Sequence, residues 1–320
     1  MRIVVTMPVF DDWESAAALC AMIDAEFHRA QAFTVSVLLI DDGSTRVLDL
    51  PFSSLHLKSL EAISVLKLRR NLGHQRAIAV ALGFIQESIP CDAVIVMDAD
   101  GEDRAEDIPR LLEQLCSSPQ PVAVFAERGR RVEGFKFRSF YACYRALHFL
   151  LTGRGIKIGN FSVLPAEHLR SIVAYPELWN HYAATIVNSR LPYRTIRTDR
   201  GYRLTGRSRM NFVGLVIHGL SALFAYHEIV STRFLLGSTF LGLIFVLLVL
   251  VVLFLKLQTD LAIPGWATAA VGLLFVLIIQ CLGTSLSVLF SAMINRRMLG
   301  FLPIRDYSYF VSACVRVKTK

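Results

Sequence analysis

Short apolar runs alternate with amphipathic segments through the first part of the chain. Runs rich in β-branched residues predict strands, at residues 2–7, 33–40, 63–68, 93–97 and 122–126. The segments between them predict helices, at residues 13–30, 75–87 and 105–116. Strands that alternate with helices are typical of a mostly parallel α/β sheet. After them come a short strand at 159–164, a helix at 179–189 and a further strand at 193–198.

Two much longer apolar runs follow. Residues 234–255 and 261–295 contain no charged side chain before Arg296. Each run is long enough to cross a hydrocarbon layer of about 30 Å, which takes about 20 helical residues. We therefore predict a transmembrane hairpin at about 234–255 and 266–293. Two buried core helices are the alternative.

Positive charges lie on both outer sides of this hairpin, at Arg207, Arg209, Arg233, Arg296, Arg297 and Arg305. The connector carries only Lys256 and Asp260. The positive-inside bias then places both flanks in the cytoplasm. A strand-like run follows Met1 and Arg2 at once, so no signal peptide is expected. The expected location is the cell (inner) membrane, with a cytoplasmic domain and a multi-pass anchor.

The predicted domain boundaries follow from these patterns. Residues 1–209 form a cytoplasmic catalytic domain, 210–232 an interfacial amphipathic segment, 233–295 the hairpin and 296–320 a cytoplasmic basic tail. The segment near Met210–Tyr226 is short and interrupted by His218, which favours a helix in the membrane interface. A buried helix of a soluble domain is the alternative reading of that segment.

The composition refines this picture. The chain has 320 residues, is 54% hydrophobic and carries a net charge of +8. A basic protein suits anionic lipid and phosphorylated ligands. Nucleic acid is disfavoured as a partner because the positive charges cluster near the spans. The six cysteines show no CxxC pairing, so reduced thiols are expected.

Every conspicuous polar cluster in the first half follows the end of a predicted strand. Asp11 and Asp12 follow the first, Asp41 and Asp42 the second, and residues 69–75 the third. In an open α/β sheet, ligands bind beyond the carboxyl ends of the strands. These clusters therefore predict one binding rim.

The strongest of these clusters follows the strand at 93–97. Asp98, Asp100, Glu102 and Asp103 lie within six positions. Carboxylates this close repel one another, and a divalent cation relieves the repulsion. Mg²⁺ and Mn²⁺ prefer one or two carboxylates together with substrate phosphates. The alternative is a solvated acidic loop that caps the helix from Ala105.

In combination, the motifs resemble family 2 glycosyltransferases of the polyprenyl-phosphate type, which include dolichyl-phosphate mannose synthase and bacterial undecaprenyl-phosphate sugar transferases. The hairpin after the last motif matches the bacterial two-span subgroup. The matching segments are Pro8-Val9-Phe10, Asp41-Asp42-Gly43-Ser44, Arg70-Asn71-Leu72-Gly73-His74-Gln75, Met97-Asp98-Ala99-Asp100 and Arg200-x-x-Arg203-x-x-Gly206-x-Ser208-Arg209.

The resemblance implies a GT-A (Rossmann-like) fold that binds a nucleotide sugar, and it assigns roles to residues. Asp100 and Glu102 would bind Mg²⁺ or Mn²⁺. The residues implied in catalysis are Asp98, Asp100, Arg203 and Arg209. Those implied in donor binding are Pro8, Val9, Asp12, Asp41, Asp42, Arg70, Asp98, Arg200 and Ser208.

Three positions depart from the family pattern. Glu102 stands where relatives usually have Gln, and Arg209 where they have Lys. Asn160 stands where relatives commonly carry Asp, so it cannot replace an aspartate base. A lipid phosphate has a second pKa of about 6 and is already a nucleophile at neutral pH, so the chemistry does not demand a base, and the sequence leaves open whether one acts. His74 is interpreted as a helix-start residue, and Trp179 and His181 as a packed aromatic with a surface histidine.

Guanidinium groups match phosphate oxygens, so Arg128, Arg131 and Arg138 are the candidates for the acceptor phosphate. A basic face against anionic lipid is the alternative for these three residues. Arg200, Arg203 and Arg209 are candidates to clamp the donor diphosphate.

The sequence therefore predicts the inverting transfer of a sugar from a nucleotide-diphosphate donor to polyprenyl (undecaprenyl) phosphate, for envelope glycan modification. A UDP-sugar, UDP-glucose-like, is favoured over a GDP-sugar as the donor. A processive polysaccharide synthase is one alternative, but the chain has no Gln-x-x-Arg-Trp motif. A catalytically silent membrane scaffold is another. A homo-oligomer would give the two spans further helices to pack against, and the sequence leaves this open.

Overall fold

The computed structural model describes residues 1–29, 33–46, 52, 55–128, 146–153, 158–205, 226–258, 265–297 and 300–320. The chain divides into two compact units. The sheet unit comprises Met1–Ser139, Ile156–Ala225 and Gly300–Lys320, and the hairpin unit comprises Phe140–Gly155 and Tyr226–Leu299.

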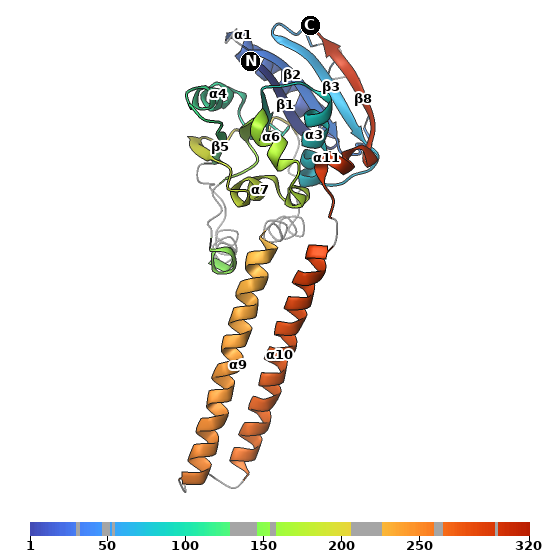
Figure 1. The fold of residues 1–320 in the computed structure, drawn as a ribbon. Coiled ribbons are helices and arrows are strands. Elements are labelled where there is room, and N and C mark those ends of the chain that lie inside the picture. Colours follow the sequence, from blue (N-terminus) through green and yellow to red (C-terminus); the bar gives the residue numbers. More distant parts are fainter. Residues whose placement is uncertain are drawn as a thin grey trace. The chain divides into compact units, whose positions relative to one another are not determined.

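The sheet unit is built on an eight-stranded mixed sheet in the order β7-β5-β6-β4-β1-β2-β3-β8 (Figure 1). Strands β3, β2, β1 and β4 are parallel neighbours, whereas β6 and β8 each run antiparallel to the strands beside them. The strands are β1 (Arg2–Val9), β2 (Thr34–Asp41), β3 (Leu60–Leu68), β4 (Ala93–Val96), β5 (Ala123–Arg128), β6 (Ser162–Pro165), β7 (Tyr193–Thr198) and β8 (Val311–Thr319).

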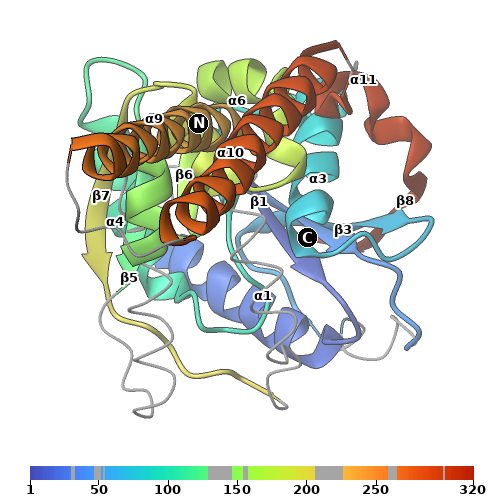
Figure 2. The same ribbon diagram turned by 90° about the horizontal axis from the view of Figure 1, so that it is seen from below.

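Helices cover both faces of this sheet. Helix α1 and the η1–α4 segment pack on one core, and α3, α6, η2 and α7 pack on the other. Figure 2 shows α1 and α3 on opposite sides of β1. The helices are α1 (Trp13–Arg29), α3 (His74–Ser88), η1 (Ala105–Asp107), α4 (Ile108–Cys116), α6 (Ala166–Ile172), η2 (Pro176–Trp179), α7 (Tyr182–Asn188), α11 (Pro303–Asp306) and η3 (Tyr307–Tyr309).

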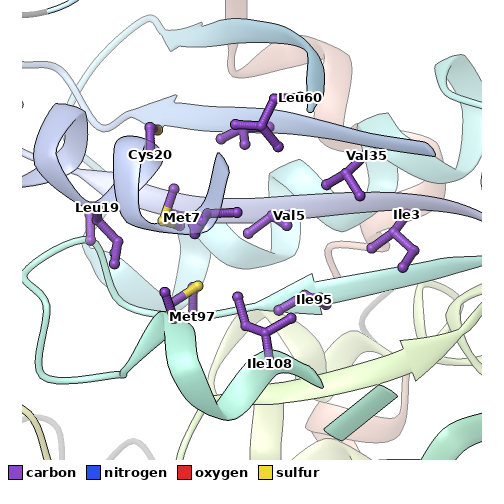
Figure 3. Close-up of a cluster of buried hydrophobic side chains, with 14 of the residues drawn as sticks. Ile3, Val5, Met7, Leu19, Cys20, Val35, Leu60, Ile95, Met97 and Ile108 are labelled. Carbon is purple, nitrogen blue, oxygen red and sulfur yellow. The ribbon is translucent and has the colours of Figure 1, made fainter. Parts of the chain in front are cut away.

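The central strands are buried on both faces, which explains their continuous apolar sequence. All four residues of β4 are buried. Side chains of one face, such as Val5 and Ile95, meet Leu19 and Ile108 from the covering helices (Figure 3). The predicted mostly parallel α/β fold is confirmed, and the sheet also contains the antiparallel strands β6 and β8.

The parallel strands also bring the polar clusters to one edge, as predicted. Val9 at the end of β1 pairs with Asp41 at the end of β2, and Thr6 pairs with Val96 at the end of β4. The turns that carry Asp12, Asp42 and Asp98 therefore leave the sheet on the same side.

The predicted basic tail, residues 296–320, differs from the structure. Arg296 and Arg297 belong to α10, and residues 300–320 return to the sheet unit, where they form α11, η3 and β8. Strand β8 pairs antiparallel with β3, from Ala62↔Thr319 to Leu68↔Val311 (Figure 1). The physical reason is the alternation of apolar and polar residues over 311–318, which suits an edge strand.

The hairpin unit contains helices α9 (His227–Gln258) and α10 (Trp266–Arg297). Both are long and apolar enough to cross a membrane by length and composition. The Ser238 and Ser285 hydroxyls lie 2.7 Å apart and join the two helices. Residues 227–232, predicted as part of the interfacial segment, belong to α9; residues 210–225 lie outside the described residues.

Candidate active site

The acidic loop, residues 98–103, begins directly after β4 and is held by its own carboxylates. Asp103 is buried, and its Oδ2 accepts the backbone N–H of Asp98 at 2.9 Å. Oδ1 of Asp100 accepts the backbone N–H of Glu102 at 3.0 Å. The alternative was that the acidic loop caps the helix that follows. The N-cap residue of η1 (Ala105–Asp107) is Arg104, which forms no side-chain cap bond, and the carboxylate of Asp103 accepts from the backbone of its own loop instead.

Two predicted arginines meet these carboxylates. Nη2 of Arg203 lies 2.6 Å from Oδ2 of Asp12, and its Nη1 lies 3.4 Å from Oδ2 of Asp100. Arg200 forms an ion pair with Glu102. Partial burial lowers the pKa of the Arg200 guanidinium, and the charges of Asp100 and Asp98 oppose that shift. Residues far apart in the sequence thus form one cluster of opposite charges.

The backbone of the arginine segment, residues 199–205, lies directly on the acidic loop. The N–H of Gly201 donates to the carbonyl of Glu102, and that of Leu204 to the carbonyl of Asp100, each at 2.9 Å. A Cβ at Gly201 would lie 2.4 Å from the carbonyl oxygen of Gly101. Gly101 itself has φ +87°, in the left-handed region that favours glycine. Both glycines therefore permit the close approach.

We expect Gly201→Ala to separate these two loops. The new Cβ would press on backbone, which cannot rotate away, at a cost of about 1–3 kcal/mol in unfolding free energy. Displacing Arg200 and Arg203 should lower turnover about 10- to 100-fold. Thermal unfolding and the turnover rate measure the two effects. Gly272→Ala is the control, because a Cβ there would meet nothing within 4 Å; equal loss in both variants would contradict this account.

Asp12 receives two hydroxyl groups in addition to Arg203. Its Oδ1 accepts from Ser15 Oγ at 2.7 Å and from Thr205 Oγ1 at 3.2 Å, and the two hydroxyls contact each other. Sequence reasoning missed Ser15 and Thr205. Ser15 follows Asp12 by three positions, the usual spacing of a helix-start contact, whereas nothing in the sequence indicates Thr205.

The turns after β1 and β2 form a second part of the rim. The Asp11 carboxylate accepts the backbone N–H groups of Thr45 and Arg46, at 2.7 and 2.9 Å. Its own N–H donates to Ser44 Oγ, and Ser44 N–H donates to Asp41 Oδ1. These bonds fix the two turns to one another. Pro8 and Val9 lie just before them, at the buried end of β1.

Asp42, a predicted donor-binding residue, is buried, and its carboxylate is directed at the loop after β3. Its two carboxylate oxygens accept the backbone N–H groups of Leu72 and Gly73, at 2.7 and 2.9 Å. Burial raises the pKa of Asp42, although the two backbone bonds oppose that shift. In this geometry Asp42 anchors the loop that carries the exposed Arg70.

We expect Asp42→Asn to destabilise the sheet unit. Its amide NH₂ would face a backbone N–H, and one buried donor would lose its acceptor at a cost of about 1–3 kcal/mol. The thermal midpoint should fall by several degrees, while Glu113→Gln on the exposed face of α4 leaves it unchanged. An unaltered midpoint for Asp42→Asn would show that the loop does not depend on this anchor.

His74 is the residue that the sequence underestimated. It begins α3, as predicted, but its Nε2 lies 3.1 Å from Oδ1 of Asp98 and 2.9 Å from Nδ2 of Asn160. Trp179 and His181 follow their sequence interpretation more closely. Trp179 packs on Phe301, and His181 accepts from the backbone of α7 as its N-cap.

Some predicted residues cannot be placed. Arg131, Arg138, Ser208 and Arg209 lie outside the described residues, as does the side chain of Arg128. Within the part of the chain that the structure describes, no three His, Cys, Asp or Glu side chains converge as a metal site. Asp100 and Glu102 nonetheless offer the hard oxygen atoms that Mg²⁺ and Mn²⁺ prefer, so a set of two carboxylates completed by phosphate oxygens fits this loop.

A rim that holds both carboxylates and guanidinium groups can bind a polyanion together with its counter-ion. The guanidinium groups contact the anion, and the carboxylates bind the cation. The guanidinium groups of Arg200 and Arg203 match the oxygens of a diphosphate. The carboxylates of Glu102 and Asp100, which these arginines contact in this structure, would then be able to bind a cation. The arrangement therefore suits a nucleoside diphosphate.

Comparisons with known proteins point the same way. The glycosyl transferase family 2 profile matches residues 5–172. The chain is 27% identical over 180 residues to a bactoprenol glucosyl transferase of Shigella phage SfX, covering 55% of this chain and 56% of the relative. It is 26% identical to an undecaprenyl-phosphate 4-deoxy-4-formamido-L-arabinose transferase of Erwinia tasmaniensis, covering 54% and 50%. The chain thus spans about half the length of the curated relatives it matches.

Among solved structures, glucosyl-3-phosphoglycerate synthase from Mycobacterium tuberculosis, in complex with Mn²⁺, UDP-glucose and phosphoglyceric acid, is similar in fold. The TM-score is 0.51 at 13% identity, covering 72% of this chain and 79% of that chain. The likeness supports the GT-A fold that the sequence predicted.

Proposed function

The chain belongs to glycosyl transferase family 2, and from that premise we propose that it transfers a sugar from a nucleoside diphosphate to a polyprenyl phosphate. The observation that carries the proposal is Arg203, which joins Asp12 and Asp100 across the rim. Two relatives that act on bactoprenol or undecaprenyl phosphate by name support the lipid acceptor. A UDP-sugar, UDP-glucose-like, is the proposed donor.

The proposed donor site uses charges already gathered at the rim. The turns held by Asp11 and Asp41 would receive the nucleoside, with Pro8 and Val9 behind them. Arg200 and Arg203 would exchange their carboxylate partners for diphosphate oxygens. They would stabilise the negative charge that grows on the leaving diphosphate, which is the largest single source of catalysis in such reactions.

Asp100 and Glu102 would hold Mg²⁺ or Mn²⁺. When bound, such a cation neutralises charge on the diphosphate leaving group. Asp98 would accept a hydroxyl group of the donor, and Arg203 would keep Asp12 and Asp100 in place before the donor arrives.

The acceptor needs little activation. At neutral pH a phosphate monoester is largely a dianion, since its second pKa is about 6. Its oxygen can attack the anomeric carbon in one displacement, which forms the new sugar–phosphate bond, releases the nucleoside diphosphate and inverts the anomeric centre. No protein base is required, in agreement with Asn160. Arg128, Arg131 and Arg138 remain the candidates for holding the lipid phosphate.

The proposed setting is the cytoplasmic face of the cell membrane. Residues before α9 and residues after α10 belong to one sheet unit, so the chain between them crosses a membrane an even number of times. Two spans satisfy this condition. The arginines that flank the hairpin favour the cytoplasmic side for the sheet unit.

The test is direct. Full-length protein in detergent, supplied with undecaprenyl phosphate, Mn²⁺ or Mg²⁺ and a panel of labelled UDP- and GDP-sugars, should form a lipid-linked monosaccharide of inverted configuration. EDTA should abolish the product. Polymeric product would favour a processive synthase, and metal-dependent nucleotide binding without any product would favour a silent scaffold; either outcome would overturn the proposal.

A further inference from the structure

Gln280 is a polar residue near the middle of a long apolar helix. It belongs to α10, in which the stretch that is long and apolar enough to cross a membrane runs from Trp266 to Ser291. Ser291 is the nearer end of that stretch, and about 16 Å of helix separates it from Gln280. A glutamine side chain cannot reach across that distance. In a membrane-spanning α10, the amide of Gln280 therefore lies within the hydrocarbon layer.

The side chain of Gln280 is exposed on the surface of the hairpin unit. Its backbone carbonyl accepts from Thr284 Oγ1 at 2.7 Å, but none of the hydrogen bonds among the described residues involves its side-chain amide. By contrast, Ser238 pairs with Ser285, and Thr239 donates to a backbone carbonyl of its own helix. Hydrocarbon offers an amide no hydrogen-bond partner, so an amide that faces lipid is costly.

Gln280 belongs to an exposed stripe of α10 whose members are spaced alternately by three and four residues. This is the spacing of the contact positions in a left-handed coiled coil. The stripe, here called the glutamine seam, consists of Leu273, Val276, Gln280, Gly283, Ser287 and Phe290, all of which are exposed. A Cβ at Gly283 would meet nothing within 4 Å. Small residues beside a polar one allow two helices in a membrane to approach closely and to form hydrogen bonds.

The opposite exposed stripe of the same helix has a different character. Its members are large and apolar, and each is at least 44% exposed: Phe275, Ile279, Leu282, Leu286 and Leu289. Lipid tails are as apolar as leucine, so such a surface is stable against lipid. The two exposed faces of α10 therefore differ, and it is the glutamine seam that calls for a protein partner.

We propose that the glutamine seam is the contact surface for a second copy of this chain. Two copies inserted in one membrane with the same topology are related by a twofold axis along the membrane normal. Their α10 helices then run parallel, and each seam residue meets its equivalent at the same depth. A primary amide carries both an acceptor oxygen and a donor NH₂. Gln280 of each copy can therefore donate to Gln280 of the other, in two reciprocal hydrogen bonds.

The composition of the glutamine seam favours a second copy over other occupants. A lipid chain has no group that pairs with the amide of Gln280. The seam carries no charged side chain, so equivalent residues do not repel one another. A polar residue at one contact position also fixes the register, because a shift of seven residues would set the amide against Leu273. The inference rests on the proposed membrane setting and is independent of the chemistry at the rim.

The first experiment measures self-association of the full-length protein in liposomes, by single-molecule fluorescence over a range of protein-to-lipid ratios. We expect a dimer. Gln280→Leu should raise the dissociation constant about 10- to 100-fold, the worth of two hydrogen bonds between membrane helices. Gln280→Asn keeps the amide and should stay closer to the natural value. Thr239→Val is the matched control, because that exposed hydroxyl is satisfied within α9, and it should not change the dissociation constant.

The second experiment locates the contact. A photoreactive benzophenone amino acid at Phe290, in the glutamine seam, should give cross-linked dimer on illumination of membranes. The same amino acid at Phe275, on the opposite stripe, should give almost none. A monomeric natural protein, a dissociation constant unaffected by Gln280→Leu, or equal cross-linking from both positions would overturn the inference. Neither experiment involves sugar transfer, so a failure of the proposed activity would be seen separately.

Discussion

Asp100→Asn should lower turnover by about 10²–10³-fold, the usual cost of removing one well-placed electrostatic stabiliser. Asp100 contributes one carboxylate to the loop and contacts Arg203. The neutral amide would weaken both the proposed cation site and the position of the guanidinium. Folding should survive, because the N–H of Glu102 can still donate to the side-chain oxygen of Asn. Sugar-transfer rates at saturating donor and Mn²⁺ measure the effect.

Two further variants frame this result. Asp92→Asn makes the same change at the opposite end of β4, where Asp92 accepts the backbone N–H of Arg2, and should keep near-normal activity. Glu102→Gln should be milder than Asp100→Asn, about tenfold or less, because the Gln side chain keeps one oxygen ligand and the Asp100 carboxylate remains. Near-normal turnover of Asp100→Asn would show that the acidic loop has a structural role and no role in catalysis.

Arg203→Lys should lower turnover about 10²-fold although the charge is kept. One guanidinium reaches Asp12, Asp100 and the carbonyl of Thr205 at once. An ammonium group is a point donor that cannot span these acceptors or form two parallel bonds to a diphosphate. The loss should appear in kcat, because the arginine acts on the charge of the leaving group.

Arg110→Lys is the matched control for this change. Arg110 also joins a carboxylate, Asp107, and a backbone carbonyl, that of Arg197, but on α4 outside the rim. It should keep full activity and lose little stability, because the exposed Arg110 is replaced by a residue that keeps a positive charge beside Asp107. If Arg203→Lys and Arg110→Lys changed turnover equally, the contacts of the Arg203 guanidinium with Asp12 and Asp100 would not contribute to catalysis.

The sequence predicts the strands and the common rim well, for a physical reason. Strands buried on both faces, such as β1 and β4, must be continuous apolar runs, and parallel strands must end at one edge. The positive charges beyond the hairpin indicate a basic tail, so strand β8, in which apolar residues alternate with Arg316 and Lys318, is not predicted. An edge strand tolerates such charges, since one of its sides faces solvent.

The partners within the rim were less predictable. Sequence order places Asp41 and Asp42 side by side, but only the fold turns Asp42 inward, onto backbone some 30 positions away. His74 and Asn160 lie 86 positions apart and meet where the start of α3 lies beside the residues that precede β6. Such contacts depend on helix orientation, which local patterns do not encode.

The pairing of β8 with β3 also orders events during synthesis. Leu68 pairs with Val311, so the edge of β3 has no β8 partner until both long helices have been translated. A nascent sheet with an open edge exposes unpaired N–H and C=O groups, which invite pairing with other chains. Closure of the sheet edge therefore waits until residues 311–319 have been translated, and a slow passage through the two long helices would prolong the period in which the nascent protein is prone to aggregate.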